Sequence, residues 1–407
     1  MNITIITCVL PWRLNSGGAQ AQFNMIDLLR KKHHITIIFP EDTQNKIDNM
    51  HELQQKWPDV KFKPFRLWRQ LLYPRFIHDK TERAFKLLLT PNSNRFKIQR
   101  ALMHYGIYPS KDFVRFIKKV VTEENTDIIQ VEFYPCLWLG GSLPANIKKV
   151  FVHHELRYIK NERYVMSYHP TEQEIQWMNE LKREELNDLD KFDLIVTLTK
   201  QDKDYLEKEG VKKPIFVSPA AVNTEVSPYK PWNKRLAFVG SYLHQPNIEG
   251  VDWFINEVQP LLKDKPQLVI IGKGWPERYQ TENVTTMGFV EDLRQAIHGS
   301  IMIVPILSGS GMRMKILEAA AMSMPIITTT VGVEGLKFKH HESCFVADTP
   351  QEFAKAIKLL SSDSQLSQSI GEKANEIFKA HYSKEVLAEV RNWIYTMIQE
   401  ITYDSEA

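Results

Sequence analysis

A chain of 407 residues is longer than one hydrophobic core usually supports, and a composition of 43% apolar and 25% charged residues excludes a disordered chain. The net charge of +3 is too small to indicate a strongly acidic or basic partner for the protein as a whole. Three widely spaced cysteines without a Cys-x-x-Cys pair argue against a disulfide framework or a zinc ribbon and favour a reducing compartment. The N-terminus lacks a basic region and a cleavage site, and no apolar run reaches the roughly 18–20 residues of a membrane span. We therefore expect a cytoplasmic protein with two domains.

Apolar runs of strand length alternate with helix-length periodic segments, which is the pattern of parallel sheets built from βαβ units. Six runs predict the strands of a first domain, at 3–9, 35–39, 127–133, 149–154, 194–199 and 214–219. The segment 222–233, rich in Pro, Ser and Asn, predicts a linker. Five further runs predict the strands of a second domain, at 235–242, 267–272, 284–290, 301–307 and 325–330. A helix is expected from about 247 to 263.

These elements predict an α/β protein of two doubly wound Rossmann-like domains, with boundaries at 1–222 and 223–385. A C-terminal helix, 386–407, is expected to return toward the first domain. Its predicted buried face consists of Val386, Leu387, Val390, Trp393, Ile394 and Met397. Because ligands of open α/β sheets bind at the carboxyl ends of the strands, the functional residues should directly follow strands.

A loop of small residues, Ser308-Gly309-Ser310-Gly311, follows one predicted strand, and a helix is expected to begin near Met312. Small residues let backbone N–H groups approach an anion, and the positive end of the helix dipole adds to the attraction. Arg313 and Lys315 would lie in the first turn, where cations are unfavourable unless an anion shares the site. The carboxylate of Glu318 is placed to accept both hydroxyls of a ribose. The alternative is an ordinary Gly/Ser turn before a helix with solvated charges.

The run from Ser308 to Leu336 resembles the donor-site signature of the retaining GT-B glycosyltransferases, in particular the branch of the family-4 enzymes that carries a Gly-Ser-Gly-Met-Arg element. The resemblance extends over both domains and the closing helix, and it is strongest from about 236 to 346. It implies an N-terminal acceptor-binding domain, a C-terminal nucleotide-sugar-binding domain and metal-independent transfer with retention. Most of the wider family has a Glu-x7-Glu pair, of which this chain keeps the second residue as Glu318 and has Ser310 in place of the first.

The resemblance also implies roles for particular residues. Gly17 and Gly18 would close over the donor phosphates, and the loop 287–290 would read the nucleobase through its backbone. Arg313 and Lys315 would stabilise the charge of the leaving group. The implied donor-binding residues are Gly17, Gly18, Gly240, Ser241, Gly288, Val290, Ser310, Gly311, Met312, Arg313, Lys315 and Glu318.

A histidine pair, His153-His154, ends another predicted strand. The resemblance implies that His154 contacts the transferred sugar as a catalytic residue, with His153 as the second choice. A structural role is the alternative for such a pair. His244 and Asn247 follow the first strand of the second domain and are either donor contacts or a helix cap and a surface ring.

Metal sites are not expected. The pairs Asp188/Asp190 and Asp202/Asp204 have a spacing that holds divalent cations in other glycosyltransferases, but both lie in charge-dense helical stretches. Helix N-termini can neutralise a diphosphate without a cation, so we predict no metal and no other cofactor. The chain has no His-Glu-x-x-His, no Walker loop and no complete Gly-x-Gly-x-x-Gly.

Residues 61–119 carry fifteen Lys or Arg against three acidic residues, interleaved with aromatic side chains. This pattern suits an anionic membrane surface or a lipid-linked acceptor. The alternative is a set of amphipathic helices whose rings pack inward, and nucleic acid is not expected. The predicted activity is transfer of a sugar to a glycan or lipid-linked acceptor in cell-surface polysaccharide or glycoconjugate synthesis, by a protein that is cytoplasmic or peripheral on the cytoplasmic face of the membrane. The rivals are a sugar-nucleotide epimerase on the same scaffold and a membrane- or nucleic-acid-binding protein with a vestigial donor site.

Overall fold

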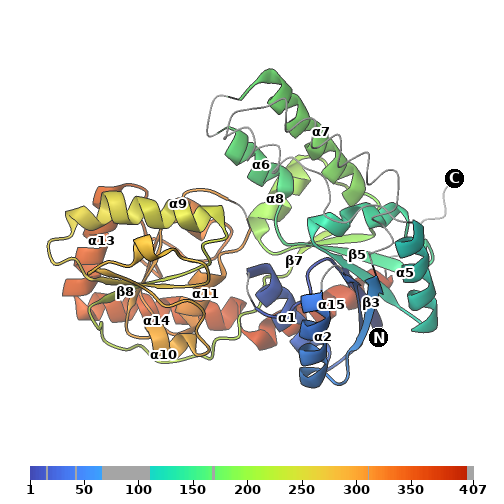
Figure 1. The fold of residues 1–407 in the computed structure, drawn as a ribbon, viewed down its shortest axis with the longest axis horizontal. Coiled ribbons are helices and arrows are strands. Elements are labelled where there is room, and N and C mark those ends of the chain that lie inside the picture. Colours follow the sequence, from blue (N-terminus) through green and yellow to red (C-terminus); the bar gives the residue numbers. More distant parts are fainter. Residues whose placement is uncertain (15–16, 42–43, 67–110, 167–169, 310, 401–407) are drawn as a thin grey trace. The chain divides into compact units, whose positions relative to one another are not determined.

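The computed structural model describes the chain except for residues 15–16, 42–43, 67–110, 167–169, 310 and 401–407. Two compact units are present, and each contains one parallel sheet (Figure 1). The predicted pair of doubly wound α/β domains is therefore confirmed. The first unit comprises Met1–Arg13, Met25–Ser218 and Val390–Ala407, and the second comprises Leu14–Asn24 and Pro219–Glu389. Residues 14–24, which the sequence placed with 1–222, thus group with the second unit.

The first unit is built on a seven-stranded sheet of order β3-β2-β1-β4-β5-β6-β7, in which every neighbouring pair is parallel. The strands are β1 (Asn2–Thr7), β2 (His34–Glu41), β3 (Lys61–Arg66), β4 (Ile128–Glu132), β5 (Lys148–His153), β6 (Leu194–Thr197) and β7 (Ile215–Val217). The central strands are buried on both faces, which explains their continuous runs of apolar residues. The chain reverses its direction across the sheet between β1 and β4, so this is the point where ligands of such sheets bind.

Helices connect these strands, and the last helix of the chain belongs to the same unit from Val390 onward. They are α1 (Gly17–Leu29), α2 (Gln44–Lys56), α5 (Lys111–Glu123), α6 (Arg157–Val165), α7 (Glu172–Leu189), α8 (Lys200–Lys208) and α15 (Lys384–Glu400), with a 3-10 helix at Tyr134–Gly141. Figure 1 shows α2 and the end of α15 on one side of the sheet and α7 on the other. Such two-sided cover follows from right-handed crossovers that run outward in both directions from the centre of the sheet.

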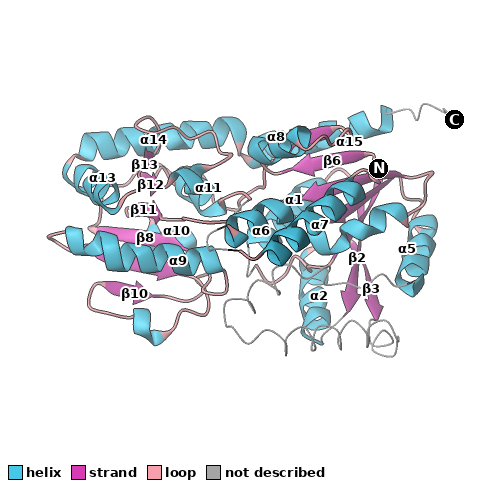
Figure 2. Cartoon of the chain, turned by 90° about the horizontal axis from the view of Figure 1, so that it is seen from above, coloured by secondary structure: helices cyan, strands magenta, loops and turns pink. Residues whose placement is uncertain are grey.

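The second unit has a six-stranded parallel sheet of order β10-β9-β8-β11-β12-β13 (Figure 2). Its strands are β8 (Arg235–Val239), β9 (Gln267–Ile271), β10 (Val284–Thr286), β11 (Ile301–Val304), β12 (Ile326–Thr328) and β13 (Phe345–Val346). Its helices are α9 (Gln245–Trp253), α10 (Leu293–Ile297), α11 (Met314–Ala321), α12 (Thr330–Val333), α13 (Pro350–Ser362) and α14 (Ser364–His381). Here the direction reverses between β8 and β11, so the loops that follow these two strands lie at the position where ligands bind.

The helix expected at 247–263 is shorter than predicted. Regular α-helix ends at Trp253, and a π-helical turn (Phe254–Val258) and a 3-10 turn (Gln259–Leu261) follow. Pro260 lies in the last turn and has no backbone N–H to donate, so the α-helical hydrogen bonds cannot continue through it.

The C-terminal helix α15 is present, but its buried face differs from the prediction. Leu387 and Ile394 are buried as expected, whereas Trp393 is 50% exposed and packs edge-on against Phe216. Arg391 and Tyr395 are buried in its place. The pattern of apolar residues missed them because it does not count polar side chains that are buried with a partner. Among the described residues, no helix combines the length and hydrophobicity that a membrane span requires.

The basic region begins with a strand that the sequence analysis did not predict. Its first residues form β3, at the edge of the sheet, where Phe65 packs on Phe113 and Phe116 of α5 with ring centroids 5.0 and 5.3 Å apart. Lys61 and Lys63 both pair with Glu124. In these described parts the rings thus pack inward, and the middle of the region, 67–110, lies outside the described residues.

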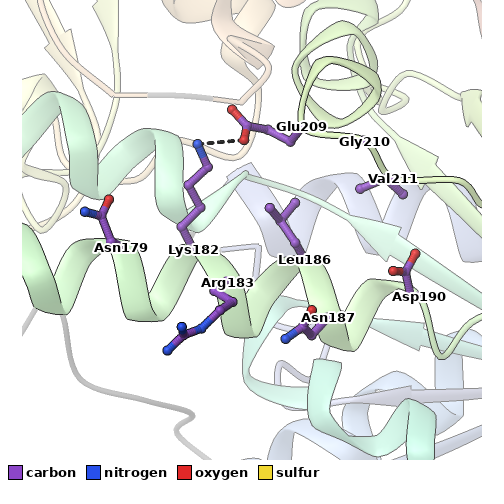
Figure 3. A pocket seen from close by; sticks show the side chains of 9 residues that line it. All are labelled: Asn179, Lys182, Arg183, Leu186, Asn187, Asp190, Glu209, Gly210 and Val211. Atoms are coloured by element: carbon purple, nitrogen blue, oxygen red, sulfur yellow. Dashed lines mark ion pairs between the residues drawn. The ribbon is translucent and has the colours of Figure 1, made fainter.

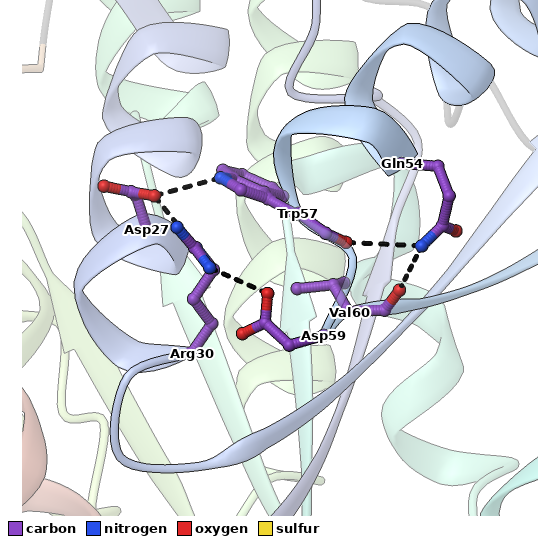
Figure 4. A network of polar contacts seen from close by, with 6 residues as sticks. All are labelled: Asp27, Arg30, Gln54, Trp57, Asp59 and Val60. Carbon is purple, nitrogen blue, oxygen red and sulfur yellow. Dashed lines mark hydrogen bonds and ion pairs between the residues drawn. The ribbon is translucent and has the colours of Figure 1, made fainter.

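A polar network fixes the turn that leads from α2 into β3 (Figure 4). The buried indole of Trp57 donates to Asp27 of α1 at 3.0 Å. Arg30 donates to Asp27 and to Asp59 at 2.9 and 2.7 Å. The amide of Gln54 donates to the backbone carbonyls of Trp57 and Val60, so its side chain closes the turn. The edge of the first sheet is therefore tied to α1 by one aromatic side chain and its hydrogen bonds.

Candidate active site

The predicted phosphate loop follows β11 and curls by means of two glycines. Gly309 and Gly311 have φ angles of 99° and 80°, which lie in the left-handed region that favours glycine. The hydroxyl of Ser308 donates to Glu249 of α9 at 2.6 Å and anchors the start of the loop. Gly250 lets α9 approach closely, because a Cβ there would lie 2.2 Å from the carbonyl oxygen of Pro305. Ser310 lies outside the described residues.

The helix after this loop begins at Met314 rather than near Met312. Arg313 occupies the N-cap position, and its backbone angles, φ −88° and ψ 84°, are not helical. Its guanidinium donates to the carbonyl of Gly311 and is largely buried. Met312 is partly buried within the loop, and Lys315 lies in the first turn of α11, as predicted from its spacing.

The ammonium of Lys315 contacts an aromatic ring and a side-chain amide. It lies 4.1 Å from the centre of the Phe238 ring and donates to Oδ1 of Asn247 at 2.8 Å. The other end of the Asn247 amide donates to the carbonyl of Ser241 at 2.8 Å. Gly240 makes room for this amide, because a Cβ there would lie 2.6 Å from Nδ2 of Asn247. Asn247 is therefore a buried link between the loop after β8 and α11, a role the sequence could not assign.

Burial shifts the charge equilibria of two side chains on α11. It lowers the pKa of Lys315 to about 7, and the positive charge of Arg313 acts in the same direction while Glu318 opposes it. It raises the pKa of Glu318 to about 7, against the opposing effect of Lys315. A partly buried cation at the positive end of a helix is unfavourable by itself.

The loops that follow β8, β9 and β10 pack closely, because glycines lie where their backbones meet. The N–H of Gly272 donates to the carbonyl of Gly288 at 2.7 Å, and Gly288 has a φ of 66°. A Cβ on Gly272 would lie 2.1 Å from the carbonyl oxygen of Gly240. Val290 follows and is partly buried. The structure thus places the loop 287–290, predicted to read a nucleobase, next to the loop that holds Gly240.

The glycines after β1 lie near α11. The structure groups them with the second unit, and a Cβ on Gly17 would meet the side chain of Met314 at 3.8 Å. Gly18 follows in the same turn of α1 and is partly buried. One turn further along, Gln22 is 1% exposed, and neither polar atom of its side chain has a hydrogen-bond partner among the described residues. The burial of this glutamine could not be predicted from the sequence, because buried polar side chains have no periodic signal.

The two histidines after β5 have different surroundings in the first unit. His153 is buried with Nε2 at 2.9 Å from Glu185, whose carboxylate also accepts the backbone N–H groups of Arg157 and Tyr158. This pair ties α7 to the start of α6 and is structural. His154 lies with Nε2 at 2.9 Å from Glu132, which the sequence analysis did not select because it lies within a predicted strand.

The Asp-x-Asp pairs have ordinary structural contacts. Asp188 pairs with Lys191 at 2.5 Å, and Asp204 pairs with Lys200 at 2.6 Å. Asp202 accepts a hydrogen bond from Thr199, the N-cap residue of α8.

A cavity of about 290 Å³ lies along α7 and contains none of the predicted site residues (Figure 3). Across it, Lys182 forms an ion pair with Glu209 at 2.7 Å. Its remaining lining residues are Asn179, Arg183, Leu186, Asn187, Asp190, Gly210 and Val211.

Comparisons with known proteins agree with this arrangement. Residues 233–363 match the model of the family described as glycosyl transferases group 1. A sucrose-phosphate synthase from Thermosynechococcus elongatus has the same fold, with a TM-score of 0.70 at 15% identity over 98% of this chain and 100% of that one. The Anabaena protein HepE, solved with UDP-glucose, gives a TM-score of 0.68 at 13% identity over 97% and 100%.

One curated relative is an uncharacterized 44.6 kDa protein in the cps region of Klebsiella pneumoniae, 26% identical over 216 residues. The match spans 49% of this chain and about half of the relative, 55%. The family model covers the unit that holds the glycine-rich loop, α11 and the glycine-packed strand ends. The chain therefore has the GT-B fold, and its residues 233–363 match the model of a group 1 glycosyl transferase domain.

Proposed function

We propose that this chain transfers a sugar from a nucleotide diphosphate sugar to a glycan or lipid-linked acceptor. The observation that carries the proposal is the confined ammonium of Lys315, held between Phe238 and Asn247 at the N-terminus of α11. Such a cation is stabilised by an anion bound at the same place, and a diphosphate fits there because it can also accept backbone N–H groups of the glycine loop.

For the remaining residues we propose the roles that the family resemblance implies. Glu318 accepts the ribose hydroxyls, and the backbone of 287–290 contacts the base. Arg313, Lys315 and the amides before them stabilise the negative charge that develops on the leaving diphosphate. His154 contacts the transferred sugar. We propose that the reaction proceeds with retention and without a metal, the departing phosphate taking the proton of the acceptor hydroxyl.

A role in polysaccharide synthesis is supported by the relative that the cps region of Klebsiella pneumoniae encodes. We also propose that the basic region, residues 61–119, contacts an anionic lipid surface on the cytoplasmic face of the membrane. In the described part of that region, Lys111 and Lys118 on α5 are exposed and available for such contact, whereas Phe113 is buried. Binding to anionic vesicles that falls with salt would support this proposal.

A thermal-shift screen of nucleotide sugars tests the proposal directly. Binding raises apparent stability by about 2.7 kcal/mol when the ligand is present at 100 times its dissociation constant, so a cognate donor should raise Tm clearly. We expect the shift to be lost in Glu318→Ala and Glu318→Gln and kept in Glu376→Ala, a change at an exposed carboxylate of the same unit. Absence of any shift across the screen, or equal shifts in all variants, would contradict the proposal. Analysis of the donor sugar without acceptor separates an epimerase, which would change the sugar itself.

Donor affinity should be highest near pH 7. Below this value Glu318 becomes protonated and can no longer accept two hydroxyls, and above it Lys315 loses the charge that attracts the diphosphate. Because a bound diphosphate favours the charged lysine, binding on the alkaline side should take up a proton. Calorimetry across this pH range measures both effects. Lys315→Met should weaken binding and remove the alkaline decline, while a flat wild-type profile would contradict the proposed roles of both groups.

A further inference from the structure

A line of buried polar side chains crosses the first unit from α15 to His154. The hydroxyl of Tyr395 donates to Oε1 of Gln130 at 2.5 Å, and Nε2 of Gln130 donates to Oε1 of Glu132 at 2.5 Å. The other carboxylate oxygen of Glu132 lies 2.9 Å from Nε2 of His154. Gln130, Glu132 and Tyr395 are each less than 5% exposed, so these contacts are sheltered from water. The C-terminal helix is thereby connected to the end of β5.

The two donors at the start of this line, Arg391 and Tyr395, determine the direction of each hydrogen bond that follows. Arg391 donates to Oε1 of Gln130 at 3.5 Å and is itself held by the hydroxyl of Ser218 at 3.0 Å. Two donors, Tyr395 and Arg391, therefore converge on one atom of Gln130, which must be the amide oxygen. The amide nitrogen then faces Glu132. Because an ionised carboxylate only accepts hydrogen bonds, Glu132 accepts from Gln130 on one oxygen and requires a donor on the other.

His154 faces this second oxygen with Nε2, and the need for a donor there determines which ring nitrogen carries the proton. We propose that Glu132 is a positioning residue that holds His154 as the Nε2–H tautomer, so that Nδ1 is an acceptor for a hydroxyl of the sugar substrate. The identity of that hydroxyl rests on the proposed function. In a neutral imidazole one ring nitrogen donates and the other accepts, and the partner of the first decides which is which. Nδ1 of His154 is buried and has no hydrogen-bond partner among the described residues.

The plane of the imidazole is held as well. Phe133 stacks on His154 with ring centroids 4.0 Å apart and an interplanar angle of 10°. To place its ring there, Phe133 adopts a φ of 68°, which is unfavourable for a bulky side chain. Strained backbone and buried polar atoms without partners are typical of sites that act on a ligand. The neighbouring His153 also has a buried Nδ1 without a hydrogen-bond partner among the described residues, but the carboxylate of its partner Glu185 accepts backbone N–H groups as well and serves the fold.

Nitrogen NMR of protein labelled with 15N-histidine tests the tautomer without any activity. The signals of His154 are identified by their loss in His154→Ala. We expect the Nε2–H tautomer in the wild type and a shift toward the Nδ1–H form or a mixture in Glu132→Gln, with a smaller change in Tyr395→Phe. Glu124→Gln removes a half-buried carboxylate that pairs with Lys61 and Lys63 of β3, and it should change nothing at His154. The Nδ1–H form in the wild type, or no effect of Glu132→Gln and Tyr395→Phe, would overturn the proposal.

Kinetics then separate a positioning role from a structural one. Glu132→Gln should lower kcat about 100-fold, the loss expected when a group in contact with substrate is misplaced. The dissociation constant of the donor nucleotide alone should stay within about twofold, because the nucleotide contacts proposed above are made by the second unit. Equal losses of kcat and nucleotide binding, or none in either, would contradict the role of Glu132. If the wild type transfers no sugar, the proposed function fails, whereas the NMR measurement still decides the tautomer.

Discussion

Replacing Lys315 by methionine should lower the rate of sugar transfer about 100- to 1,000-fold, the range found when one preorganised donor to a developing negative charge is removed. Methionine keeps the length of the side chain and its contact with Phe238 but removes the ammonium that donates to Asn247. The charge on the diphosphate grows as the bond to the sugar breaks, so kcat should fall more than donor affinity. Release of the nucleoside diphosphate measures the rate.

Lys339→Met is the matched control. This lysine is exposed in the same unit and forms only a long ion pair with Glu342, at 3.7 Å, so its loss should leave the rate unchanged. A Lys315→Met enzyme within about threefold of the wild type would exclude Lys315 from leaving-group stabilisation, because one lost donor should cost far more. A Lys339→Met enzyme as slow as Lys315→Met would mean that general surface charge, and not the ammonium beside Asn247, determines the rate.

Replacing Trp57 by alanine should reduce the free energy of unfolding of the first unit by about 3–5 kcal/mol, the usual cost of emptying the space of a buried tryptophan. The side chain is 1% exposed, and its indole N–H, in the turn after α2, donates a hydrogen bond to Asp27 of α1 (Figure 4). Its loss also removes the ring over which Arg30 lies at 6.0 Å. Hydrogen exchange of the amides of β2 and β3 reports the stability of this unit separately from the second.

Trp393→Ala provides the comparison with the same residue type. Because Trp393 is 50% exposed and packs edge-on against Phe216, its replacement should cost about 1 kcal/mol or less. Similar losses for the two tryptophans, or no faster exchange in β2 and β3 of Trp57→Ala, would show that the network does not stabilise the edge of the sheet.

The sequence was sufficient to predict the two parallel sheets, because their central strands are buried on both faces and form continuous apolar runs. It failed at β3, where the exposed Lys61 and the half-buried Lys63 give an edge strand the composition of a basic surface segment. The end of α9 was also missed. The apolar periodicity continues past Trp253, and the consequence of Pro260 for the hydrogen bonds was not recognised.

In the candidate site, the local features were predictable and the long-range partners were not. The glycine loop, Arg313, Lys315 and Glu318 are close in sequence, so their spacing places them in one loop and the first two turns of the helix that follows it. Asn247 is 68 residues from Lys315, and Tyr395 is 265 residues from Gln130. Polar side chains that are buried with such distant partners have no periodic signal, since burial patterns are detected from apolar residues.

The central claim, that the chain transfers a sugar from a nucleotide diphosphate donor, is tested most directly by following one reaction. A donor found by thermal shift is incubated with glycan acceptors, and the products are identified by mass and by the anomeric coupling in proton NMR. The account predicts a new glycoside and an equal amount of nucleoside diphosphate, with the anomeric configuration of the donor kept and with no requirement for added metal. A donor that binds but is never transferred, or a product formed equally well by Glu318→Ala and Lys315→Met, would contradict it.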